Sequence, residues 1–410
     1  MTGPSRRAGT AGAQSRAPDP AATEGEAPSR PPGGQEAAPA DPGAPGGPGS
    51  PGSGRTPEPG GLRDPGSPRR AAGLRPGPLL LALGALLAAL TVGLLAGAAG
   101  IAPRQAVLQL IDWLPLLTAD AGLTPVEQSL LLELRLPRVL LAAAVGGLLA
   151  IAGAAYQGVF RNPLADPYLL GAAAGAGLTT TAAIVFLAGD DVSLVIPAAA
   201  FAGAVGGVLL AYTLGNVAGR GGGTATLVLA GVAVSSFLTA GQTFVQQLGV
   251  DELERIYAWM LGDVGGGWEK LALAAPYAAV SVGVLLLHGR VLDVLSVGDD
   301  EATGLGLNAA RARLAVLLAA SLATAAAVAV SGLIGFVGIV VPHVVRRLAG
   351  GSYRVVLPLS LLGGAAFLVL ADVIARTVLA PAELPIGVVT AFVGAPFFVA
   401  VLRMTRGEGA

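Results

Sequence analysis

Residues 314–345 read LAVLLAASLATAAAVAVSGLIGFVGIVVPHVV, a run that contains no Asp, Glu, Lys or Arg. A helix that crosses the hydrocarbon core of a bilayer needs about 20 apolar residues, so this run is long enough for more than one crossing. Its second half is interrupted by Gly332, Gly335, Gly338 and Pro342. We therefore predict two helices with a turn near 335–338, at a depth where irregular backbone has to face protein or a water-filled cavity.

Eight further runs without charged residues precede or follow this one. They cover residues 79–103, 139–160, 168–189, 192–219, 221–250, 271–289, 355–371 and 384–402. The whole chain is 53% hydrophobic and 12% charged, too few charges to cover the surface of a soluble protein of 410 residues. The fold class is therefore predicted to be all-α, a polytopic membrane protein with ten transmembrane helices.

The first 78 residues differ from the rest in composition. They hold 17 of the 30 prolines and 17 glycines, with Leu62 and Leu74 as the only large aliphatic residues. Such a segment cannot bury enough apolar surface to offset the entropy lost on ordering. We predict a disordered cytoplasmic tail over 1–78 that acts as a spacer, with partner binding as the alternative, and a membrane domain over 79–406.

The distribution of Lys and Arg among the loops places the N- and C-termini in the cytoplasm. Under this orientation Arg135, Arg138 and Arg376 lie on the outer side, as exceptions to the rule. Arg376 follows Asp372 by four residues on the same helix face, which predicts an ion pair between them. Asp372 is also the one clear ionisable residue within a predicted membrane helix.

Sequence patterns for catalysis and metal binding are missing. The chain has no Cys and only two His, and it carries no Walker loop, no dinucleotide-binding fingerprint and no HExxH motif. We therefore expect no enzyme activity, no metal site and no cofactor on this chain, and no nucleic-acid partner. A protein that moves a solute without a charge relay or nucleotide site has to take its energy from a partner.

The segment between the sixth and seventh predicted helices is the candidate contact with that partner. An acidic cluster marks a helix start there, and glycines divide the segment into two short helices at the membrane surface. The residues proposed for coupling are Asp299, Asp300, Glu301, Ala302, Gly304, Leu305 and Gly306. An ordinary solvated loop is the alternative.

The fifth predicted helix carries a polar stripe. Ser235, Thr239, Gln242 and Gln246 share one helical face. Polar residues on a membrane helix should face another helix or a water-filled path, and their spacing favours neither.

Six motifs occur in one order along the chain. They are LRLPR at 134–138, QGVFRNPLADP at 157–167, LAGVA at 229–233, GLG at 304–306, GFVGIVVPH at 335–343, and ELPIGVVT at 383–390 with GAP at 394–396. Together they closely resemble the permease subunits of the iron-siderophore and cobalamin (FecCD-type) family of ABC importers. The likeness runs from about residue 79 to the C-terminus.

The resemblance implies a cell-membrane protein with several partners. These are a second permease copy, in a homodimer or a paralogous heterodimer, two ATPase subunits that bind ATP and magnesium, and an extracytoplasmic substrate-binding protein. It implies that the coupling helices, about 292–310, seat in the ATPase, and that the fifth helix with its polar stripe lines the translocation path. It also implies that Arg135, Arg138 and Arg376 grip acidic residues of the binding protein.

The function that we predict is that of the permease subunit of an ATP-driven importer of ferric siderophores, working by alternating access. Cobalamin or haem import is the alternative within the same class. A secondary transporter or channel without an ATPase, and a membrane scaffold or receptor whose tail is the working part, are the rivals from other classes.

Overall fold

The structure is a computed structural model that describes residues 75–96, 102–112, 122–187, 194–218 and 224–407. The described residues form helices and turns, without a strand. The predicted tail lies outside the described residues except for its last four. Pro76, Gly77 and Pro78, which we assigned to the tail, form the first turn of α1 (Pro76–Leu95) instead. Proline fits there because the first turn of a helix has no intrahelical use for its missing N–H.

Each predicted membrane run corresponds to a helix in the described part of the chain. These helices are α1, α4 (Leu136–Phe160), α5 (Ala172–Leu187), α6 (Val195–Ala218), α7 (Thr224–Leu248), α9 (Gly267–Leu287), α12 (Ala309–Ser331), α13 (Val337–Ala349), α14 (Tyr353–Thr377) and α15 (Ile386–Gly407). Among the described residues, seven helical stretches are long and apolar enough to cross a membrane, and the stretches 172–187 and 386–401 are apolar but shorter. The number of crossings, ten, stays a prediction.

Shorter helices connect the long ones. They are α2 (Pro103–Asp112), α3 (Pro125–Ser129), the π-helix η1 (Leu130–Arg135), the 3-10 helix η2 (Val250–Glu252), α8 (Leu253–Met260), α10 (Gly289–Val297) and α11 (Asp299–Gly304). The helices α3, η1 and α4 run on without a break. The predicted break within 314–345 is confirmed, because α12 ends at Ser331 and α13 begins at Val337.

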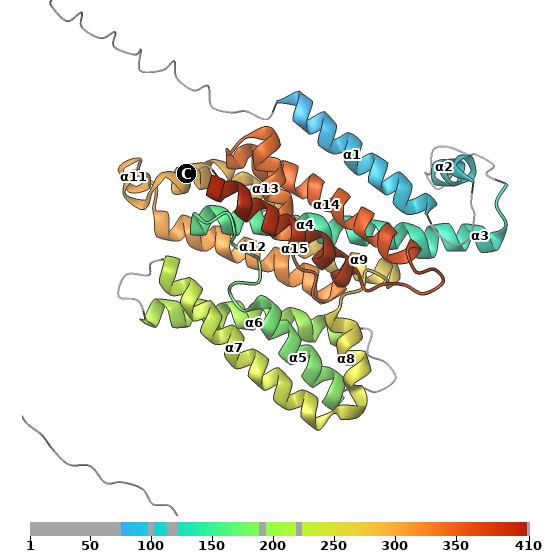
Figure 1. Ribbon diagram of the computed structural model, residues 1–410, viewed down its shortest axis with the longest axis horizontal. Helices are drawn as coiled ribbons and strands as arrows, with labels where there is room; N and C mark the ends of the chain where they lie inside the picture. Colours follow the sequence, from blue (N-terminus) through green and yellow to red (C-terminus); the bar gives the residue numbers. More distant parts are fainter. Residues whose placement is uncertain (1–74, 97–101, 113–121, 188–193, 219–223, 408–410) are drawn as a thin grey trace, which may run out of the picture. The chain divides into compact units, whose positions relative to one another are not determined.

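The central helix of the body is α4, which packs against α12, α13 and α14 and lies between them in Figure 1. Two glycines allow this. A Cβ on Gly146 would overlap the carbonyl oxygen of Gly364 in α14, and one on Gly153 would overlap that of Gly338 in α13. The backbones of these helices therefore touch, as small residues permit in membrane proteins.

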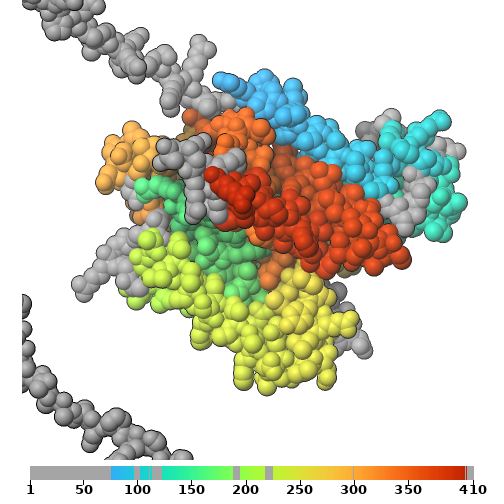
Figure 2. All heavy atoms as spheres, in the orientation of Figure 1, coloured from blue at the N-terminus to red at the C-terminus, as the bar shows by residue number. Residues whose placement is uncertain are grey.

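The helices α5, α6 and α7 form a second packed group, which joins the first through contacts of α12 with α6 and α5. Gly175 of α5 and Gly203 of α6 meet backbone to backbone in the same way. In the space-filling view, this group and α8 form the green and yellow part of the surface (Figure 2).

Candidate functional site

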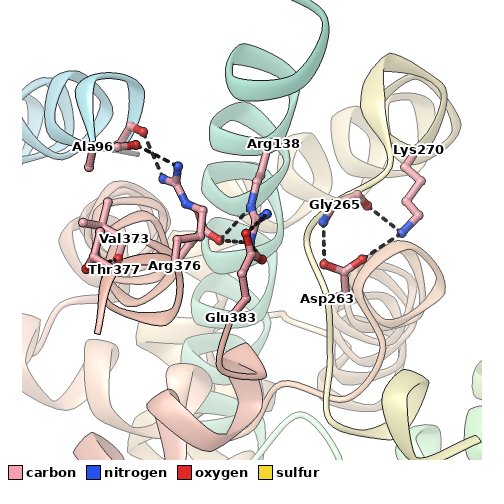
Figure 3. A network of polar contacts seen from close by, with 11 residues as sticks. Ala96, Arg138, Asp263, Gly265, Lys270, Val373, Arg376, Thr377 and Glu383 are labelled. Carbon is pink, nitrogen blue, oxygen red and sulfur yellow. Dashed lines mark hydrogen bonds and ion pairs between the residues drawn. The ribbon is translucent and has the colours of Figure 1, made fainter. Parts of the chain in front are cut away.

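Arg138 stands in the first turn of α4 and holds two carboxylates at once (Figure 3). Its Nε donates to Oδ1 of Asp372 at 3.0 Å. Its Nη1 and Nη2 donate to Oε1 and Oε2 of Glu383, at 3.2 and 2.8 Å. The pairing with Glu383 is therefore bidentate, a geometry that fixes the orientation of both groups.

Arg376 holds the same aspartate from the opposite side. Its Nε lies 2.9 Å from Oδ2 of Asp372, which confirms the ion pair predicted from the four-residue spacing. Its Nη1 and Nη2 donate to the carbonyl oxygens of Ala96 and Gly93, both at 3.0 Å. These carbonyls end α1, where the helix dipole favours a cation.

Arg135 reaches the same end of α1, because its Nη1 donates to the carbonyl oxygen of Leu94 at 3.4 Å. We call the residues Arg135, Arg138, Asp372, Arg376 and Glu383 the arginine cluster. The structure thus gathers, near the end of α1, the three arginines that were proposed for docking. Each of them also bonds to other residues of this protein. The exposed fractions of the side chains are 19% for Arg138, 7% for Arg376 and zero for Asp372.

Sequence reasoning missed part of this cluster. Asp372 was paired only with Arg376, and Glu383 appeared only as the first letter of a motif. Their contacts with Arg138 join residues 234 and 245 positions apart, which no local pattern reveals. A nearby turn was missed as well. In it, Lys270 donates to the carbonyl oxygen of Gly265 at 2.6 Å and lies 3.8 Å from Asp263 (Figure 3).

The predicted coupling segment forms α10 and α11, two short helices that break at Gly298, as the sequence indicated. Asp300, Glu301 and Gly304 are exposed, and so is 75% of Leu305. The side chain of Asp299 lies outside the described residues. Ala302 is completely buried, so it anchors α11 to the body rather than facing outward.

A contact that sequence reasoning missed joins α10 to the start of α14. Oδ2 of Asp293 accepts hydrogen bonds from Ser352 Oγ at 2.8 Å and from Arg354 Nε at 3.2 Å, and Oδ1 accepts one from the backbone N–H of Tyr353. The N-cap residue of α14, Ser352, makes no side-chain cap of its own. An acid from another helix therefore supplies the capping group and the favourable charge at this N-terminus.

From this joint, α14 runs the length of the body to the arginine cluster. A helix of 25 residues is about 37 Å long at 1.5 Å per residue. Its first residues bond to Asp293, and its last turns carry Asp372 and Arg376. The α10–α11 segment and the arginine cluster therefore lie at opposite ends of α14.

The polar stripe of α7 is divided by its neighbours. Gln242 is buried, with an exposed fraction of 5%, and its Nε2 lies 3.3 Å from the sulfur of Met260, which Gln246 also approaches. Ser235 is partly buried beside Gly171. Of the four predicted path residues only Thr239 is exposed. Ser236 and Thr243, which lie beside the stripe on the same helix, are exposed as well.

The connection from α4 to α5 is an ordered turn. Asn162 accepts a hydrogen bond from the N–H of Leu164 at 2.9 Å, which is the turn signal expected of Asn before Pro. Next to it, burial raises the pKa of Asp166 to about 6, against the opposing effect of a hydrogen bond from the N–H of Tyr168. The hydroxyl of Tyr168 donates to the carbonyl oxygen of Ile334, which fastens this turn to the break between α12 and α13.

Comparisons with known proteins find relatives of this chain. The sequence profile of the FecCD transport family matches residues 85–404. The cobalamin import system permease protein BtuC of Halobacterium salinarum is 42% identical over 285 residues, which cover 69% of this chain and 75% of that protein. The Fe(3+)-citrate import system permease protein YfmD of Bacillus subtilis is 42% identical over 282 residues, covering 68% of this chain and 83% of that protein. A solved structure described as an inward-facing conformation of a putative metal-chelate type ABC transporter superposes with a TM-score of 0.70. It is 28% identical and covers 80% of this chain and 100% of that one.

Proposed function

The chain belongs to the FecCD transport family, and from this membership we propose that it is the permease subunit of an importer of ferric siderophores, driven by a separate ATPase. The observation that carries the proposal is the family match over almost the whole helical body. Relatives named for Fe(3+)-citrate, iron(3+)-hydroxamate and hemin transport support an iron chelate as the substrate class, and one named for cobalamin import supports the alternative. Cobalamin and haem are the alternatives.

We assign the ATPase contact to α10 and α11. Their exposed residues combine negative charge on Asp300 and Glu301 with an apolar side chain, Leu305, and such a surface suits a groove on another protein. With this end in the cytoplasm, the tail and the C-terminus are cytoplasmic too. The arginine cluster then faces the extracytoplasmic binding protein.

The path is assigned to the exposed face of α7, where a second permease copy would complete it. Thr239, Ser236 and Thr243 provide hydroxyl groups on this face. The residues Ser235, Gln242 and Gln246 instead hold α7 against α5 and α8. Alternating access then requires that movement at α10–α11 is transmitted to the rest of the protein, and α14 spans the distance from α10 to the arginine cluster.

Transport in reconstituted vesicles tests the function. The complex of this chain with its ATPase and its binding protein should import a radiolabelled ferric siderophore only when ATP is supplied on the ATPase side. Cobalamin and haem, offered in parallel, identify the alternatives. Uptake that a proton or sodium gradient drives without ATP would contradict the proposal and favour a secondary transporter.

Replacing Asp293 by Ala should uncouple ATP hydrolysis from uptake. The change removes the cap and the ion pair at the start of α14, worth about 1–2 kcal/mol together, and 1.4 kcal/mol corresponds to a factor of ten. We expect roughly tenfold less substrate imported per ATP hydrolysed, with the ATPase rate of the complex retained. Asp293→Asn keeps an acceptor for the N–H of Tyr353. Its ratio of substrate imported to ATP hydrolysed should lie between those of Asp293→Ala and the unsubstituted protein. An unchanged transport-to-hydrolysis ratio in Asp293→Ala would contradict this role.

A further inference from the structure

Glu383 occupies the side of Arg138 that a docking partner would need. A guanidinium has five N–H donors. In Arg138, the N–H of Nε donates to Asp372, and Nη1 and Nη2 each donate to Glu383. Nη2 also lies 2.9 Å from Asp372. No fork of two free donors is therefore left on Arg138 for a carboxylate of another protein.

The two acids of the cluster differ in how firmly they are held. Asp372 is completely buried and bridges two arginines, so no partner can reach it. The side chain of Glu383 is 50% exposed, and among the described residues it bonds to Arg138 alone. Water screens an ion pair that is half exposed on one side, so the pair contributes little net stability and another carboxylate can replace Glu383.

The segment that carries Glu383 leads directly into α15. The N–H of the next residue, Leu384, donates to the carbonyl oxygen of Ala375 in α14, and the N–H of Gly387 donates to that of Leu261. Release of Glu383 would remove the side-chain tie between α4 and the start of α15 and leave these backbone contacts in place. A change at the outer surface would thus reach a helix of the body directly.

We propose that Glu383 is a resident substitute for a carboxylate of the substrate-binding protein. On docking, an acidic residue on a lobe of that protein takes the bidentate position on Arg138, Glu383 moves into solvent, and the start of α15 is freed from α4. The exchange keeps Arg138 paired at every stage, so docking does not require a new desolvated charge. The inference rests on the proposed function, because it assumes an extracytoplasmic binding protein.

The test is the affinity between the complete transporter in lipid nanodiscs and its substrate-binding protein. Glu383→Gln should bind it about threefold to fivefold more tightly, because the competing carboxylate of a weakly held, half-exposed ion pair is gone. Glu133→Gln is the matched control. It removes one exposed carboxylate from η1, on the same end of the protein, and leaves the bonds of Arg138 to Asp372 and Glu383 intact. It should change the affinity less than twofold.

A second comparison separates exchange from general electrostatics. In an Arg138→Ala background, Glu383→Gln should have no effect on affinity, since there is no position left to compete for. Equal effects of Glu383→Gln and Glu133→Gln, or weaker binding by Glu383→Gln, would overturn the inference. Failure of the unsubstituted transporter to bind the protein at all would instead count against the proposed function.

Discussion

Replacing Asp372 by Ala is expected to lower the free energy of unfolding by about 3–5 kcal/mol, the cost of removing one partner from a buried ion pair. Asp372 has no exposed surface, and it bridges Arg138 to Arg376 through separate oxygens. Its loss leaves the guanidinium of Arg376, only 7% exposed, facing the carbonyl oxygens of α1 without a negative charge beside it. The contacts among α1, α4 and α14 should loosen together.

The midpoint of thermal unfolding in detergent measures this effect. Glu383→Gln is the control within the same cluster, because its half-exposed carboxylate should contribute less than about 1 kcal/mol. Asp372→Asn keeps the side-chain volume and one acceptor, so its midpoint of thermal unfolding should lie between those of Asp372→Ala and Glu383→Gln. If Asp372→Ala and Glu383→Gln had equal midpoints, the aspartate would not be the centre of the cluster.

Local patterns in the sequence predicted those features that neighbours along the chain determine. The break between α12 and α13 follows from glycines within one run, and the division of α10 from α11 follows from Gly298. The pair of Asp372 with Arg376 follows from the helix repeat. Each of these depends on residues fewer than ten positions apart, and the sequence contains the whole cause.

The features that the sequence could not predict depend on which helices meet. Helical spacing placed Ser235, Thr239, Gln242 and Gln246 on one face, but it could not show that Gly177 of α5 would leave room for Gln242. The same holds for the contact of Asp293 with α14, which crosses 60 positions. Single acids of this kind look like ordinary loop charges until the packing is known.

Replacing Gly146 by Ala should be as damaging as the loss of Asp372, although it adds only one methyl group. The new Cβ would overlap the carbonyl oxygen of Gly364 and lie 2.6 Å from Cβ of Leu368. Backbone atoms cannot rotate away as a side chain can, so α4 and α14 would have to separate along their whole contact. We expect a loss at the upper end of the 1–3 kcal/mol usual for overpacking, or beyond it.

The control for this effect is Gly283→Ala in α9, because nothing lies within 4 Å of a Cβ at that position. Alanine favours a helix over glycine by about 1 kcal/mol, so Gly283→Ala should be neutral or stabilising in the same detergent measurement. Similar midpoints for the two variants would mean that α4 and α14 can move apart at little cost. A rigid α14 could then not carry movement from Asp293 to the arginine cluster, so this pair of alanine substitutions also tests whether the two ends of the protein are mechanically connected.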